Sequence, residues 1–157
     1  MSHLLSLLRN GDYLTRERAR LWAGGFLIAF AAAILFLALT AQGLNDYKNR
    51  PLGTDFSNVY AAGTLTRDGV PGTAYDPARQ YERERAVFGA DTPFYGWHYP
   101  PFFLAVADAL SALPYLPALI LWQGATLALV LLAMARLLRG VQITQGRTWL
   151  LYTLAFP

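Results

Sequence analysis

The chain has 157 residues, of which 55% are hydrophobic and only 15% are charged, and it contains no cysteine. So few charges exclude an ordinary soluble domain, in which roughly 25% of the residues are charged, and the missing cysteines exclude disulfides, thiolate metal sites and a cysteine nucleophile. The net charge of +3 does not indicate a nucleic-acid-binding protein, because the basic residues flank apolar runs instead of forming one basic patch.

The first part of the chain predicts a cytoplasmic segment, residues 1–20, and a first membrane span, residues 21–42. The cytoplasmic segment has an excess of basic residues, Arg9, Arg16, Arg18 and Arg20 against Asp12 and Glu17, and such an excess favours the inner side of the membrane. The apolar run after it is long enough, as a helix, to cross a hydrocarbon core of about 30 Å. A cleaved signal peptide is the alternative, but its apolar region is usually only about 7–15 residues long.

A polar loop, residues 43–98, follows the first span, and we place it on the extracytoplasmic side. Its six basic and seven acidic residues balance, so no positive excess opposes its transfer across the membrane. Asp76 and Pro77 are typical of a helix start and Gly89 of a helix end, which predicts a helix near residues 77–88. The face that we expect to lie on the membrane or the bundle is formed by Ala78, Tyr81, Arg85 and Phe88.

The segment Gly53-Thr54-Asp55-Phe56 places a carboxylate shortly after the first span. Near lipid headgroups, a partly desolvated Asp55 could act as a general base that takes a proton from an attacking hydroxyl. The alternative is structural, because Asp55 could cap a short helix that starts after Asp55 or Ser57. One face of that helix would be formed by Phe56, Val59 and Tyr60. The local sequence leaves both interpretations open.

Three apolar segments come after the loop. Residues 99–113 predict a short span or a re-entrant helix, residues 115–138 a full span, and residues 149–157 the start of a further span. If the first of these segments spans, the arginines that follow the second fall outside, against the charge rule, and if it re-enters they fall inside: Arg136, Arg139 and Arg147. The last segment has no polar tail, so we expect the chain to be cut short.

Other polar and aromatic side chains allow both a functional and a structural interpretation. Three arginines of the predicted loop helix could hold a lipid phosphate, or could form a solvated face beside Glu82 and Glu84: Arg79, Arg83 and Arg85. The aromatic residues at the end of the loop could stack on a sugar ring or anchor the chain at the membrane interface: Phe94, Tyr95, Trp97, His98 and Tyr99. Asp108 lies in an apolar segment, where an ionisable group is by default functional or paired.

Taken in order, several short segments resemble glycosyltransferase family 87, whose members are polyprenyl-phosphate-dependent membrane enzymes of the GT-C superfamily. The segments, within a resemblance that extends from Leu21 to Trp122, are Asp55-Phe56, Val59-Tyr60-Ala61-Ala62-Gly63, Gly69, Ala74-Tyr75-Asp76 and His98-Tyr99-Pro100-Pro101-Phe102-Phe103. No dinucleotide-binding, Walker, zinc-protease or serine-hydrolase motif competes with them.

The resemblance implies an all-α membrane protein, a polytopic helical bundle of the GT-C type with a partly helical extracytoplasmic loop, in the inner (plasma) membrane. It implies transfer of mannose or another hexose from a polyprenyl-phosphate sugar donor to a glycolipid or polysaccharide acceptor, with no cofactor beyond that donor substrate. Asp55 corresponds to the catalytic base. The residues that it implies at the substrate are Tyr60, Tyr75, His98 and Tyr99. We assign no metal ligand, and metal dependence stays open.

The family needs several further spans to build the groove for the lipid carrier, so we expect the chain as given to be inactive alone. Two other functions stay open. One is a non-enzymatic membrane accessory protein whose loop binds a partner, and the other is a transporter fragment in which Asp108 faces a pore. Membrane lipids are expected partners in each case, and nucleic acid in none.

Overall fold

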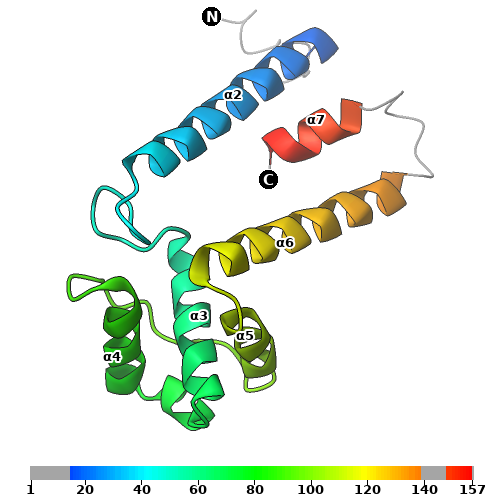
Figure 1. The fold of residues 1–157 in the computed structure, drawn as a ribbon. Helices are drawn as coiled ribbons and strands as arrows, with labels where there is room; N and C mark the ends of the chain where they lie inside the picture. The colour runs from blue at the N-terminus through cyan, green and yellow to red at the C-terminus, as the bar shows by residue number, and fades with distance from the viewer. Residues whose placement is uncertain (1–14, 139–147, 157) are drawn as a thin grey trace, which may run out of the picture. The chain divides into compact units, whose positions relative to one another are not determined.

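A computed structural model describes residues 15–138 and 148–156. This part of the chain is helical and has no sheet, which confirms the expected all-α class (Figure 1). Its elements are α2 (Arg16–Thr40), α3 (Thr54–Arg67), the 3₁₀-helix η1 (Pro71–Tyr75), α4 (Pro77–Phe88), α5 (Phe103–Ser111), α6 (Tyr115–Leu138) and α7 (Thr148–Ala155). Several charged residues used to predict the orientation lie outside the described residues: Arg9, Asp12, Arg139 and Arg147.

Two helices, α2 and α6, are long and apolar enough to cross a membrane. They have 25 and 24 residues, which corresponds to about 37 and 36 Å of helix. Most of their side chains are exposed in the described part of the chain, including Ile28 and Ile120, and few are buried. Exposed branched aliphatic side chains along a whole helix are unfavourable in water and favourable in the hydrocarbon core of a bilayer. Helix α6 has the bounds of the predicted span 115–138, whereas α2 overlaps the predicted span 21–42 and begins five residues before it.

The chain divides into two compact units, one formed by residues 36–127 and the other by residues 1–35 and 128–157. The first, here called the loop unit, has α3 at its centre, between α4 and α5, with η1 also packed against α3 (Figure 1). Its buried core draws on every one of these elements and on the start of α6: Phe56, Val59, Ala62, Leu65, Ala74, Phe88, Trp97, Leu104, Ala107, Leu110, Tyr115 and Ala118.

The polar stretch before α3 is fixed by one carboxylate. Asp46 accepts hydrogen bonds from the backbone nitrogens of Lys48 (2.8 Å) and Arg50 (3.0 Å) and pairs with the Arg50 guanidinium at 2.8 Å. Burial would raise the pKa of Asp46, but the hydrogen bonds from Arg50 and Lys48 outweigh it and hold that pKa below its ordinary value. This compact turn sets where the chain enters α3.

Helix α4 confirms the helix predicted at residues 77–88. The Asp76 carboxylate accepts hydrogen bonds from the backbone nitrogens of Ala78 (2.9 Å) and Arg79 (3.4 Å), as an N-cap should. Pro77 opens the helix, and Gly89, with φ at 110°, ends it. Both ends were therefore encoded by local sequence signals.

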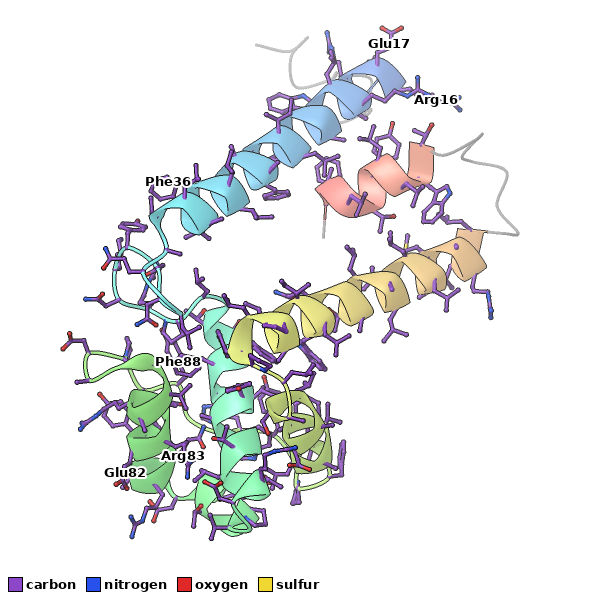
Figure 2. All side chains as sticks on the ribbon, in the orientation of Figure 1. Arg16, Glu17, Phe36, Glu82, Arg83 and Phe88 are labelled. Atoms are coloured by element: carbon purple, nitrogen blue, oxygen red, sulfur yellow. The ribbon has the colours of Figure 1, made fainter. Side chains whose placement is uncertain are left out.

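Only Phe88 of the predicted face of α4 is buried, so that face is not the one that packs within the loop unit, and its place on a membrane stays a prediction. The buried residues are Gln80, Glu84 and Phe88, whereas Ala78 and Arg85 of the predicted face are exposed. Figure 2 shows Phe88 at the end of the helix and Glu82, which is exposed, on the side away from α3. An apolar pattern could not mark a face on which an amide and a carboxyl are buried through hydrogen bonds.

Helix α3 confirms that the loop contains a second helix, but it begins at Thr54, before the predicted start after Asp55 or Ser57, and it ends at Arg67. Phe56 and Val59 are buried and Tyr60 is half-buried, as the predicted face requires. Helix α5 has only 9 residues, or about 14 Å, and it packs against α3. Whether residues 99–113 span or re-enter the membrane stays a prediction.

In the other unit, an aromatic side chain of α2 contacts Phe156, the residue that follows α7 (Thr148–Ala155). The Phe26 ring lies 5.5 Å from that of Phe156, edge to face, and it also neighbours Trp22 at 6.4 Å and Phe30 at 6.3 Å. Such rings contribute packing beyond the apolar area that they bury. Helix α7 coincides with the start of the predicted further span at 149–157.

Candidate functional site

A pocket of about 330 Å³ in the loop unit is lined by the start of α3, the chain before α5, the start of α5 and the third turn of α6. Its lining residues are Gly53, Thr54, Asp55, Phe56, Val59, Tyr99, Phe103, Trp122 and Gln123. The Tyr115 hydroxyl at the start of α6 donates a hydrogen bond to the Leu52 carbonyl, which ties α6 to the entry of α3. A carboxylate, an amide and several aromatic rings therefore converge on one cavity.

Asp55 lies in the first turn of α3 and does not cap it, so the capping interpretation was wrong. The N-cap position is occupied by Gly53, with φ at 68°, and no side chain accepts a capping hydrogen bond there. Among the described residues no hydrogen bond or ion pair engages the Asp55 carboxylate, and it is exposed at the pocket. The first turn of a helix stabilises a negative charge, so this carboxylate is available to accept a proton from a bound hydroxyl.

One wall of the pocket is aromatic and held in place by ring contacts. Tyr99 and Phe103 lie 4.9 Å apart between ring centroids, and Phe103 meets Trp122 edge to face at 5.9 Å. Trp122 is also stacked on Phe56 of α3 at 6.4 Å. Rings fixed in this way offer flat apolar surfaces without the entropy cost of ordering them on binding.

Two further residues predicted to bind substrate, Tyr75 and His98, lie outside the pocket lining. Tyr75 donates a hydrogen bond to the Tyr99 carbonyl at 3.0 Å, so it supports the aromatic wall from behind. His98 is exposed and its ring neighbours Gly96. Neither residue lines the pocket, and their substrate-binding role stays a prediction.

Tyr60 is directed elsewhere. It donates a hydrogen bond to the Leu113 carbonyl at 2.9 Å, and its ring meets that of Tyr115 at 5.1 Å. Burial raises the pKa of the Tyr60 phenol. Tyr60 therefore joins α3 to the turn before α6, and a direct role at the substrate stays a prediction.

A buried polar network behind the pocket positions the chain that leads to Tyr99. Asn58 of α3 donates to the Gly96 carbonyl at 2.7 Å, and Gln80 of α4 donates to the Asn58 carbonyl at 3.0 Å. Glu84 accepts a hydrogen bond from the Tyr95 backbone nitrogen at 3.0 Å. Burial raises the pKa of the Glu84 carboxyl, although these hydrogen bonds oppose the shift.

The three arginines of α4 are paired or stacked. Arg79 pairs with Glu82 at 3.1 Å, Arg83 with Asp68 at 2.6 Å, and Arg85 lies over the Tyr81 ring at 5.3 Å. These contacts favour a solvated helix face over a phosphate site. The described residues hold no cluster of three or more His, Cys, Asp or Glu side chains that could bind a metal ion.

Asp108, which sequence analysis left as functional or paired, has a partner. Its carboxylate lies 3.4 Å from the guanidinium of Arg67 at the end of α3, and both side chains are about half exposed. The pair joins α5 to α3, and it gives the transporter interpretation no support.

Trp122 and Gln123 were not predicted as site residues, because the apolar pattern of residues 115–138 indicates only a span. The available signal was an amide within an otherwise apolar run, which is unfavourable in lipid unless it finds a partner. No sequence pattern could predict that Gln123 and Asp55 line the same pocket, because the two residues lie in helices far apart in the chain.

Comparison with known proteins supports the resemblance. Residues 97–157 match the family model described as glycosyltransferase family 87. The match includes Tyr99, Phe103, Trp122 and Gln123 of the pocket and begins after Asp55. No curated protein and no solved structure matches the chain.

Proposed function

We propose that this chain, which is similar to glycosyltransferase family 87 over residues 97–157, takes part in hexosyl transfer at a membrane surface. The donor is a polyprenyl-phosphate sugar, of which mannose is the leading candidate, and the acceptor is an extracytoplasmic glycolipid or polysaccharide. The observation that carries the proposal is the unengaged Asp55 carboxylate facing aromatic rings in one pocket. A base beside apolar ring faces suits a carbohydrate, whose own faces are partly apolar.

The proposed reaction is a direct displacement at the anomeric carbon. Asp55 takes the proton of the acceptor hydroxyl as its oxygen attacks that carbon, and the bond from the anomeric carbon to the phosphate oxygen breaks. The bonding electrons leave with polyprenyl phosphate, so no nucleotide and no covalent enzyme intermediate is required. General-base help of this kind is typically worth about 10²–10⁴-fold in rate.

The proposed location is the inner (plasma) membrane, with the N-terminus cytoplasmic and Asp55 on the extracytoplasmic side. Two observations support it. The chain has two helices long and apolar enough to span, and the first turns of α2 carry Arg16, Arg18 and Arg20. A lipid-linked donor and a membrane-surface acceptor would both be within reach of a site at that surface.

The proposal is tested with Asp55→Asn in the protein as its gene encodes it, assayed in membranes with labelled polyprenyl-phosphate mannose. Transfer should fall by about a hundredfold or more, while expression and the unfolding temperature stay unchanged. Asp91→Asn is the matched control, because Asp91 is an exposed loop carboxylate that does not line the pocket. Full activity of Asp55→Asn would remove Asp55 from the mechanism, whereas no transfer by the unmodified protein would favour a non-enzymatic accessory protein.

A further inference from the structure

Gln123 is out of place for a residue that serves only to cross a membrane. It lies in the third turn of α6, where the neighbouring side chains are apolar. Thr126, one turn further on, satisfies its hydroxyl by donating to the carbonyls of Trp122 (2.9 Å) and Gln123 (3.0 Å). The described residues offer no such partner to the Gln123 amide, and an amide without a partner in an apolar environment is costly.

The position of Gln123 indicates what its partner is. The residue lines the same pocket as the Asp55 carboxylate and the Trp122 ring. A primary amide presents two N–H donors and an oxygen with two lone pairs, and this set matches two neighbouring hydroxyls of a sugar ring. An amide from another span would satisfy Gln123 equally well, but it would not explain why Gln123 lies at the cavity.

Trp122 supplies the complementary surface. Its indole is fixed by Phe56, stacked at 6.4 Å, and by Phe103, edge to face at 5.9 Å. A ring that is already fixed on two sides loses little conformational freedom when a ligand binds. It can therefore hold the apolar face of a sugar at low entropy cost. Trp122 and Gln123 are consecutive in α6, and both line the pocket, so one helix turn offers a ring face together with hydrogen-bonding groups.

We infer that Trp122 and Gln123 form the acceptor-sugar subsite of this pocket, with the Gln123 amide binding hydroxyls of the acceptor ring. The inference rests on the proposed function in one respect. A sugar whose hydroxyl is deprotonated by Asp55 must be the acceptor, since the donor reacts through its anomeric carbon. The binding of a sugar ring by these residues does not depend on that step.

Binding is therefore tested first, by saturation-transfer NMR on the detergent-solubilised protein with methyl α-mannoside, α-glucoside and α-galactoside. The unmodified protein and Thr126→Val should both give a signal with at least one of the glycosides. Gln123→Leu should lose most of that signal. Thr126→Val is the matched control, because it removes a polar group from the same helix without changing the pocket lining. Equal signals from Gln123→Leu and Thr126→Val, or none from the unmodified protein, would overturn the inference.

Kinetics then distinguish acceptor from donor. Gln123→Leu should raise the acceptor KM by about tenfold, as expected for lost hydrogen bonds to hydroxyls, and should leave the donor KM within about twofold. A rise in the donor KM alone would place the subsite on the donor and refute the assignment. Sugar binding that persists in an Asp55→Asn variant with full transfer activity would refute the proposed base while leaving the sugar subsite standing.

Discussion

The carbonyl oxygen of Ala107 lies 2.1 Å from the point where a β-carbon on Gly63 would stand. Helices α3 and α5 therefore touch backbone to backbone at this point, and Ala107 is completely buried. Asp55 is at the start of α3 and Phe103 at the start of α5, so the contact between Gly63 and Ala107 helps to set the width of the pocket.

The first prediction concerns this contact. Gly63→Ala should lower the free energy of unfolding by about 1–3 kcal/mol, because the added methyl meets backbone that cannot rotate away. Thermal unfolding in detergent measures the loss, and amide hydrogen exchange should show faster exchange in α5. Gly72→Ala is the control, since a β-carbon there meets no atom within 4 Å. Equal stability of the two variants would contradict the close packing described here.

The parts of the fold that could be predicted from the sequence are those set by local signals. Asp76-Pro77 and Gly89 marked both ends of α4 because caps act on neighbouring backbone groups. The apolar runs that became α2 and α6 were visible because a bilayer needs an uninterrupted length. Each of these signals is read within one segment of the chain.

The parts that escaped prediction depend on contacts between distant segments. The buried face of α4 carries Gln80 and Glu84, whose burial makes sense only once Asn58 and Tyr95 are known to meet them. The sequence could not exclude Asp55 as a cap, because no local signal shows that Gly53, with a positive φ, occupies the N-cap position of α3. The neighbourhood of Asp55 and Gln123 likewise needs the tertiary fold.

The second prediction concerns the N-cap of α4. Asp76→Ala should cost about 1 kcal/mol, because it leaves the backbone nitrogens of Ala78 and Arg79 without their acceptor. Asp76→Ser should recover most of the loss, since a serine hydroxyl also caps. Amide hydrogen exchange in the first turn of α4 reports the effect directly. The capping role would be ruled out by exchange rates that do not differ between Asp76→Ala and Asp76→Ser.

The third prediction concerns the buried Glu84 carboxyl, whose pKa is raised above its ordinary value of 4.5 by burial. The folded chain then holds the proton more tightly than the unfolded chain does. The contribution of Glu84 to stability is therefore fully present below pH 4.5 and is lost as the pH rises through the raised pKa. Glu84→Gln removes this titration, while its amide oxygen can still accept the hydrogen bond from Tyr95.

We accordingly expect Glu84→Gln to unfold at a higher temperature than the unmodified protein near neutral pH, with the difference shrinking as the pH falls toward 4.5. Unfolding temperatures measured over this range test the sign. Glu82→Gln is the control on the same helix, because Glu82 is exposed and paired only with Arg79. A pH-independent difference would mean that Glu84 is already charged in the folded chain.

The last prediction concerns Asp108 and its partner Arg67. Their side chains are 42% and 48% exposed and 3.4 Å apart, and an ion pair so accessible to water is worth at most about 1 kcal/mol. Asp108→Asn should therefore change the unfolding temperature little, and should leave hexosyl transfer unchanged because Asp108 does not line the pocket. Thermal unfolding and the transfer assay measure both effects, with Asp55→Asn as the inactive reference. A large loss of transfer in Asp108→Asn at unchanged stability would contradict the structural role and would give Asp108 a part in the transfer reaction.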